Sequence, residues 1–168
     1  TAPLPKPVLP VSDEVLPQGF TWGGSNITDQ DWQFIQKVIQ DKKVTRVLEF
    51  GSGLSTILLD SIGMEVVSCE TNLAWMNKMK EQCPTTEFVL WDGQSSPIYD
   101  YMEGILDQYG KFDLAFVDGP AGGSNREEST KIASEFAKVV IVHDANREWE
   151  RLWQDQFLKP NFSGPTKG

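Results

Sequence analysis

Short apolar runs alternate along the chain with longer segments in which apolar residues recur at helical spacing. The runs predict strands at about residues 46–50, 65–70, 88–91, 112–117 and 139–142. The spacing predicts helices at about residues 54–62, 126–137 and 146–157. Two further helices fall between strands: one carries Leu73, Met76 and Met79 and stops at Pro84, and one carries Tyr101, Ile105 and Leu106.

The start of the chain differs from this pattern. Five prolines fall within residues 1–20, which predicts an extended arm instead of a helix. Thr28 with Asp31 resembles a helix N-cap with an acidic first turn. The apolar residues that follow have the spacing of an amphipathic helix: Trp32, Ile35, Val38 and Ile39. At 168 residues the chain fits one domain, which we expect over residues 21–168.

Five strands that alternate with helices predict a parallel sheet with right-handed crossovers. Nearly continuous apolar strands fit burial on both faces. We therefore expect an α/β fold with a three-layer, Rossmann-like arrangement: a mainly parallel sheet of at least five strands with helices on both faces. Ligands of such sheets bind outside the carboxyl ends of the strands. Acids fall at four of the predicted ends and indicate a shared site there: Glu70, Asp92, Asp118 and Asp144.

The first predicted strand leads into a turn that contains two glycines. Gly51 and Gly53 leave backbone N–H groups open to a ligand, because glycine has no side chain in the way. Glu70 lies seventeen residues after Gly53 at the end of the second strand, where a ribose would present its hydroxyls. These features together indicate a cofactor that contains a nucleoside.

Thr56 helps to distinguish between a dinucleotide and another nucleoside-containing cofactor. A dinucleotide fingerprint has a third glycine at that position, so NAD is disfavoured. The sequence from Leu48 to Thr56, with its E-x-G-x-G pattern, resembles motif I of class I S-adenosylmethionine-dependent methyltransferases. The resemblance implies the class I methyltransferase fold and S-adenosylmethionine as cofactor. The cofactor-binding residues expected on this basis are Glu49, Gly51, Ser52, Gly53, Ser55, Glu70, Asp92, Gly93 and Asp118.

Residues 112–158 are also similar to the glucuronoxylan 4-O-methyltransferase family, through Phe116-Val-Asp-Gly-Pro and Val142-His-Asp-Ala-Asn-Arg-Glu. The resemblance implies that His143, Asp144 and Arg147 face the acceptor, with Asn146 beside them. Arg147 could pair with an acceptor carboxylate, or equally with Glu150 along one helix face. The first half of the chain departs from that family, since its glycine loop is of the general methyltransferase type.

Asp118 is the strongest candidate for chemistry, because the resemblance places it near the transferred methyl group. A hydroxyl acceptor must also lose a proton. Asp118, Asp144 or His143 could take that proton directly, or a divalent metal bridging the two aspartates could lower the hydroxyl pKa. Metal-dependent O-methyltransferases carry an Asp-Asn pair after the fifth strand, and here Asn146 is displaced by one residue. Metal use therefore stays open.

Charge and composition argue against some classes of binding partner. A net charge of −9 disfavours nucleic acid, and the two cysteines make no disulfide framework. No apolar run has the length of a membrane helix or signal core, so we expect a cytoplasmic protein that does not bind membranes. An uncovered sheet edge could be covered by a second copy in a homodimer. The expected function is O-methylation of a small-molecule or saccharide hydroxyl; the alternatives are an NAD-linked oxidoreductase and a non-catalytic domain that binds a nucleoside cofactor.

Overall fold

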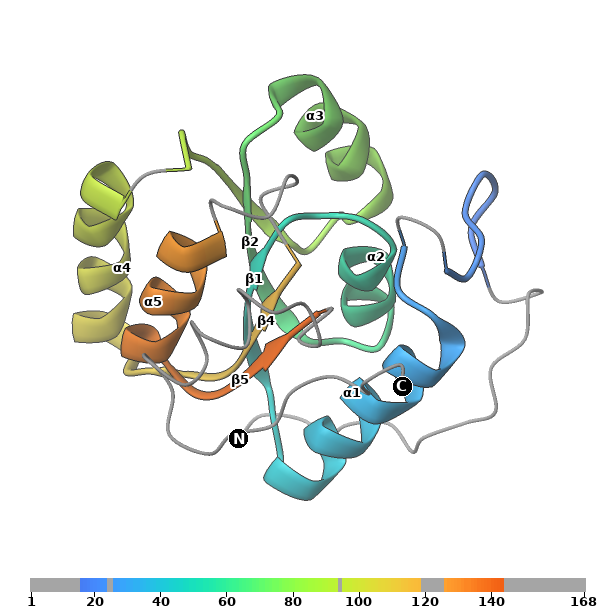
Figure 1. Ribbon diagram of the computed structural model, residues 1–168, viewed down its shortest axis with the longest axis horizontal. Helices are drawn as coiled ribbons and strands as arrows, with labels where there is room; N and C mark the ends of the chain where they lie inside the picture. The colour runs from blue at the N-terminus through green and yellow to red at the C-terminus, as the bar shows by residue number, and fades with distance from the viewer. Residues whose placement is uncertain (1–15, 24–25, 94, 119–125, 144–168) are drawn as a thin grey trace.

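The computed structural model describes residues 16–23, 26–93, 95–118 and 126–143. Helices and strands alternate through this part of the chain (Figure 1). The helices are α1 (Asp29–Lys42), α2 (Leu54–Ser61), α3 (Leu73–Gln82), α4 (Ser95–Tyr109) and α5 (Arg126–Phe136). The strands are β1 (Arg46–Phe50), β2 (Glu65–Glu70), β3 (Glu87–Leu90), β4 (Phe112–Val117) and β5 (Ala137–Val142).

The five strands form one parallel sheet in the order β3-β2-β1-β4-β5. β1 is central, and the chain moves outward from it first through β2 to β3 and then through β4 to β5. The reversal of direction beside β1 is the topological switch point, which in open α/β sheets is where ligands bind. The register pairs Phe50 of β1 with Cys69 of β2 and with Val117 of β4, so neighbouring strands end at the same edge.

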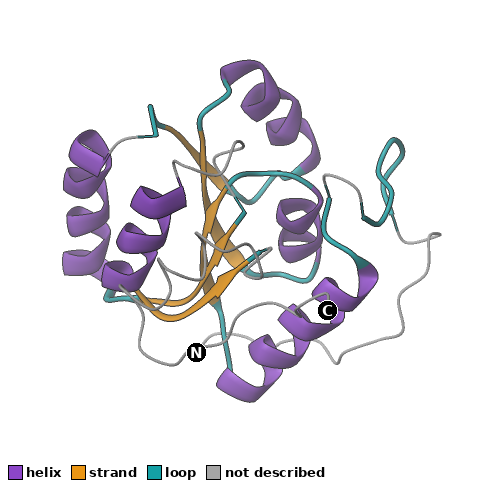
Figure 2. Cartoon of the chain, viewed as in Figure 1, coloured by secondary structure: helices purple, strands orange, loops and turns teal. Residues whose placement is uncertain are grey.

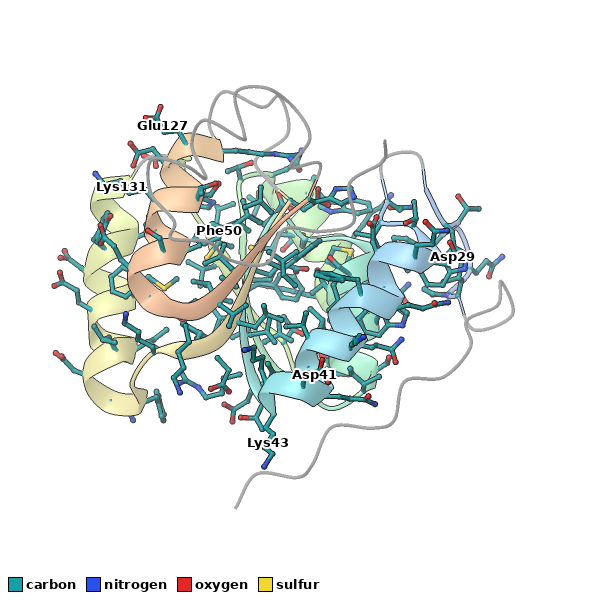
Figure 3. All side chains as sticks on the ribbon, turned by 60° about the horizontal axis from the view of Figure 1, so that its bottom comes forward. Asp29, Asp41, Lys43, Phe50, Glu127 and Lys131 are labelled. Atoms are coloured by element: carbon teal, nitrogen blue, oxygen red, sulfur yellow. The ribbon has the colours of Figure 1, made fainter. Side chains whose placement is uncertain are left out.

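Helices cover both faces of the sheet, which makes three layers (Figures 1 and 2). On one face α4 and α5 pack through Ile98, Met102 and Ile132. On the other face α1 and α2 pack through Trp32, Ile35 and Leu58 against the opposite side of the same strands. Phe50 lies inside the molecule between these layers (Figure 3) and is fully buried.

Helix α1 begins with the predicted N-cap. The Thr28 hydroxyl accepts a hydrogen bond from the Asp31 backbone N–H, and the Asp31 carboxylate accepts one from the Thr28 N–H, which is a complete capping box. Lys43 ends the helix in the left-handed conformation at φ 53°. Asp29 and Lys43 lie at opposite ends of the helix (Figure 3).

The predicted fold class is confirmed, and the strands at 46–50, 65–70 and 112–117 have the predicted bounds. The predicted helix at 146–157 and most of the predicted arm lie outside the described residues. At the end of that arm, Leu16 and Phe20 pack against the core on the α1 side of the sheet. None of the described helices combines the length and apolar character needed to span a bilayer.

Candidate cofactor-binding and catalytic site

A cavity of about 410 Å³ opens at the carboxyl ends of the strands, beside β1. Its size lies within the range of small-molecule sites. The described residues that line it come from the segment before α1, the glycine turn, the first turns of α2 and α3, and the ends of β2, β3 and β4: Asn26, Ile27, Gly51, Ser52, Gly53, Leu54, Ser55, Cys69, Glu70, Thr71, Asn72, Trp75, Trp91 and Asp118.

The hydrogen-bond ladder of the sheet continues one residue past the strands and brings the candidate residues together. Gly51 N–H donates to Cys69 O, Trp91 N–H to Glu70 O, Asp118 N–H to Phe50 O and His143 N–H to Val117 O, at 2.8 to 3.1 Å. In sheet order, the edge therefore presents Trp91, Glu70, Gly51, Asp118 and His143. Residues from five separate strands meet here because parallel strands end at one edge.

The glycine turn joins β1 to α2. Gly51 has φ 87°, in the left-handed region that favours glycine. The Gly53 N–H donates to the Thr56 hydroxyl at 3.0 Å, which fixes the first turn of α2. Thr56 is fully buried and also donates to Glu49. The residue that replaces the third glycine of a dinucleotide fingerprint therefore has a structural role of its own.

Glu49 lies beneath the turn and is fully buried. Its carboxylate accepts hydrogen bonds from the hydroxyls of Ser55 at 2.5 Å, Ser68 at 2.8 Å and Thr56. Burial raises the pKa of Glu49 to about 7, although these hydroxyls oppose the rise. Glu49 is not among the described residues that line the cavity. The structure shows Glu49 supporting the turn, and its predicted contact with a cofactor stays a prediction.

Glu70 faces the cavity, and both carboxylate oxygens accept hydrogen bonds. Oε1 accepts from the Ser52 N–H at 3.0 Å and from the Ser52 hydroxyl at 2.7 Å. Oε2 accepts from the backbone N–H groups of Thr71 and Asn72 at 2.8 and 2.9 Å. The backbone donors therefore hold the carboxylate in place, and the Ser52 hydroxyl adds a side-chain hydrogen bond to Oε1.

Two tryptophans form walls of the cavity. The Trp75 indole N–H donates to Ser52 O at 2.8 Å, which ties α3 to the glycine turn. Trp91 is buried and packs edge-on against Phe50, with 5.5 Å between ring centroids. Asp92 is exposed and Gly93 follows at φ 85°. Neither is among the described residues that line the cavity, so the predicted adenine contact of Asp92 stays a prediction.

Asp118 belongs to a chain of charged groups on the β4 side. Its Oδ1 lies 2.7 Å from His143 Nδ1, and His143 Nε2 lies 3.2 Å from Oδ2 of Asp31. Arg126 donates to the carbonyl oxygens of His143 at 3.2 Å and Asp118 at 3.0 Å. Its guanidinium also lies 3.7 Å from the Asp118 carboxylate. Of this group only Asp118 is among the residues that line the cavity.

Burial alone would raise the pKa of Asp31, but hydrogen bonds from His143 and Thr28 outweigh it and hold the pKa below its usual range. Sequence reasoning identified Asp31 only as a capping residue and did not single out Arg126. The pairing of Asp31 with His143 spans 112 residues, and no local pattern signals it.

Asp144, Asn146 and Arg147 lie outside the described residues, so their predicted roles stay predictions. Within the described part of the chain, no cluster of three or more His, Cys, Asp or Glu side chains is placed to hold a metal ion. The proposed metal pair includes Asp144, and metal use therefore stays open.

The fold is similar to that of a TehB-like SAM-dependent methyltransferase from Corynebacterium glutamicum. The two chains superpose with a TM-score of 0.50 at 16% identity, over 72% of this chain and 70% of the other. At that identity the likeness concerns the fold alone, an α/β, Rossmann-like sheet with helices on both faces. No family model matches the sequence, and no curated protein matches it either. The resemblance of residues 112–158 to glucuronoxylan 4-O-methyltransferases thus has no support from these comparisons.

Proposed function

We propose that this protein is an S-adenosylmethionine-dependent methyltransferase that acts on a hydroxyl of a small molecule or saccharide. The observation that carries the proposal is the pairing of Glu70 with the glycine turn in one cavity at the switch point of the sheet. The methyltransferase fold of the Corynebacterium protein supports it.

The residues present fit the cofactor. Glu70 offers two carboxylate oxygens that are held by backbone N–H groups and suit a ribose diol. Trp75 and Trp91 offer apolar walls for a purine. The first turn of α2 presents N–H groups beside Gly53 that suit a carboxylate. When bound, S-adenosylmethionine supplies a methyl group on a positively charged sulfur, open to in-line attack.

The protein's own part is to align the acceptor and to receive its proton. Asp118 lines the cavity next to Gly51 in the sheet order and is the carboxylate placed to accept a proton from an acceptor hydroxyl. His143 and Arg126 hold it from the side away from the cavity. Alignment of the reacting atoms supplies most of the acceleration in such a displacement. A carboxylate base at this position favours an oxygen acceptor over one that carries no proton to remove.

The first test is calorimetry of the purified protein with S-adenosylhomocysteine and, separately, with NAD. Binding of S-adenosylhomocysteine alone supports the proposal. Binding of NAD alone would favour the oxidoreductase alternative, and binding of neither by folded protein would overturn the assignment of the cavity.

The second test follows transfer of a labelled methyl group to catechol and to glucuronoxylan oligosaccharides. Each acceptor is assayed with magnesium and with EDTA. Transfer to the oligosaccharide alone would support the saccharide acceptor, and loss of transfer in EDTA would support a metal at Asp118 and Asp144. Cofactor binding without transfer to any hydroxyl acceptor would leave the non-catalytic domain as the better assignment.

A further inference from the structure

Asp31 lies on the opposite side of His143 from the candidate catalytic residue. It belongs to the first turn of α1, yet only 4% of its surface is exposed and its carboxylate faces the sheet edge. His143 is also buried and stands between two carboxylates, Asp118 at 2.7 Å and Asp31 at 3.2 Å. The described residues thus form a continuous chain from a helix N-terminus to the cavity.

The hydrogen bonds define what each member does. One ring nitrogen of His143 contacts Oδ1 of Asp118 and the other contacts Oδ2 of Asp31, so the ring links the two carboxylates. The ring also packs beside Phe116, with 6.1 Å between centroids, which limits its tilt. With Oδ1 of Asp118 held by the ring, the second oxygen of this planar group is fixed in position as well. His143 therefore determines how Asp118 presents itself to the cavity.

The carboxylate of Asp31 is itself held by the capping box of α1. Its Oδ2 accepts from the Thr28 N–H at 2.9 Å as well as from His143, and its own N–H donates to the Thr28 hydroxyl at 3.0 Å. The capping box therefore anchors the carboxylate that the ring contacts. On the other side Arg126 holds the backbone carbonyls of Asp118 and His143. Asp31 and Asp118 are thus held by two residues, Arg126 and His143.

We propose that Asp31 is a positioning residue for methyl transfer, which acts through His143 to hold Asp118 in the orientation that receives the acceptor's proton. The proposal rests on the function proposed above. The plain alternative is that Asp31 only caps α1 and secures it to the sheet. The two differ in what loss of the Asp31 charge does to the imidazole and to turnover.

The chain offers a direct spectroscopic test, because His143 is the one histidine among its 168 residues. In tag-free protein with ¹⁵N-labelled histidine, the ring gives a single set of nitrogen resonances. We expect the ring nitrogens of the unsubstituted protein to show the shifts of an imidazole held in hydrogen bonds, not those of a free imidazole. This measurement needs no substitution, so it does not depend on any variant folding. The spectrum of a free imidazole would overturn the proposal.

Asp31→Asn and Asp29→Asn form a matched pair. Both remove one negative charge from the first turn of α1, but Asp29 is exposed and outside the chain of contacts. We expect Asp31→Asn to change the imidazole spectrum and to lower kcat on the order of 100-fold, as misplacement of a reacting group does. Its affinity for S-adenosylhomocysteine should stay within about threefold, since Asp31 does not line the cavity. Asp29→Asn should leave all three quantities unchanged.

The outcomes separate the two proposals. A folded Asp31→Asn protein with the kcat and imidazole spectrum of Asp29→Asn overturns the positioning role and leaves the methyltransferase assignment intact. If the unsubstituted protein neither binds S-adenosylhomocysteine nor transfers methyl groups, the assignment itself fails and the positioning role fails with it. Circular dichroism and thermal unfolding of each variant establish that the protein is folded.

Discussion

Glu49 permits a test of how the glycine turn is supported. Its carboxylate is fully buried and receives three hydroxyl hydrogen bonds, and its pKa is raised from 4.5 to about 7. Because the folded protein binds this proton more tightly than the unfolded chain does, Glu49 contributes most to stability below pH 4.5. That contribution is lost as the pH rises through about 7.

The structure sets the size of the effect. A pKa that moves from 4.5 to about 7 corresponds to roughly 3 kcal/mol of unfolding free energy, lost across that pH window. Glu49→Gln keeps the shape and stays uncharged at every pH. We therefore expect the variant to lose less stability than the parent between pH 5 and pH 8, by about 2–3 kcal/mol.

The assay is urea unfolding of both proteins at pH 5, 6, 7 and 8, followed by circular dichroism. Other titrating groups contribute equally to both curves, so the difference between the curves isolates Glu49. Glu65→Gln, at an exposed position of β2, serves as the control for removal of a carboxylate. Parallel curves for parent and Glu49→Gln would refute the reasoning, since Glu49 would then titrate as in the unfolded chain.

Three further predictions concern ligand binding and turnover. Glu70→Gln should weaken S-adenosylhomocysteine binding by about 10- to 100-fold in calorimetry, because it removes a charged acceptor worth about 1.5–3 kcal/mol, whereas Glu65→Gln should not. Asp118→Asn should lower kcat by on the order of 10²-fold or more while binding is mostly kept; equal losses of both would show that Asp118 only binds. Trp75→Phe removes the hydrogen bond to Ser52 and should weaken binding by about fivefold, since such a bond contributes about 1 kcal/mol; unchanged affinity would mean that the turn holds its shape without it.

The sequence predicted the scaffold well because its signals are local. Apolar runs mark buried strands, and the strands at 46–50, 65–70 and 112–117 were predicted residue for residue. The ends of parallel strands meet at one edge, so the sequence correctly places Glu70 and Asp118 at a common edge. These predictions needed only periodicity and one rule about parallel sheets.

The contacts made by the side chains were harder to predict. The sequence assigned Glu49, the next-to-last residue of β1, to the cofactor. Its burial depends on hydroxyls from α2 and β2, which only the packed structure brings around it. The capping role alone accounts for an aspartate at position 31, so no pattern in the sequence indicates its contact with His143. Pairings between distant segments depend on the packing of α1 against the sheet.

The hydrogen bonds of Glu70 have a consequence for the folding of the protein. A buried carboxylate awaiting a ligand would be a charge without partners, and such a group strongly disfavours folding. Here the Ser52 hydroxyl and the backbone N–H groups of Ser52, Thr71 and Asn72 satisfy it. Folding of this chain therefore leaves no uncompensated charge at Glu70. Under the proposed function, a ribose hydroxyl would take the place of the Ser52 hydroxyl, and that exchange would favour ready release of a spent cofactor.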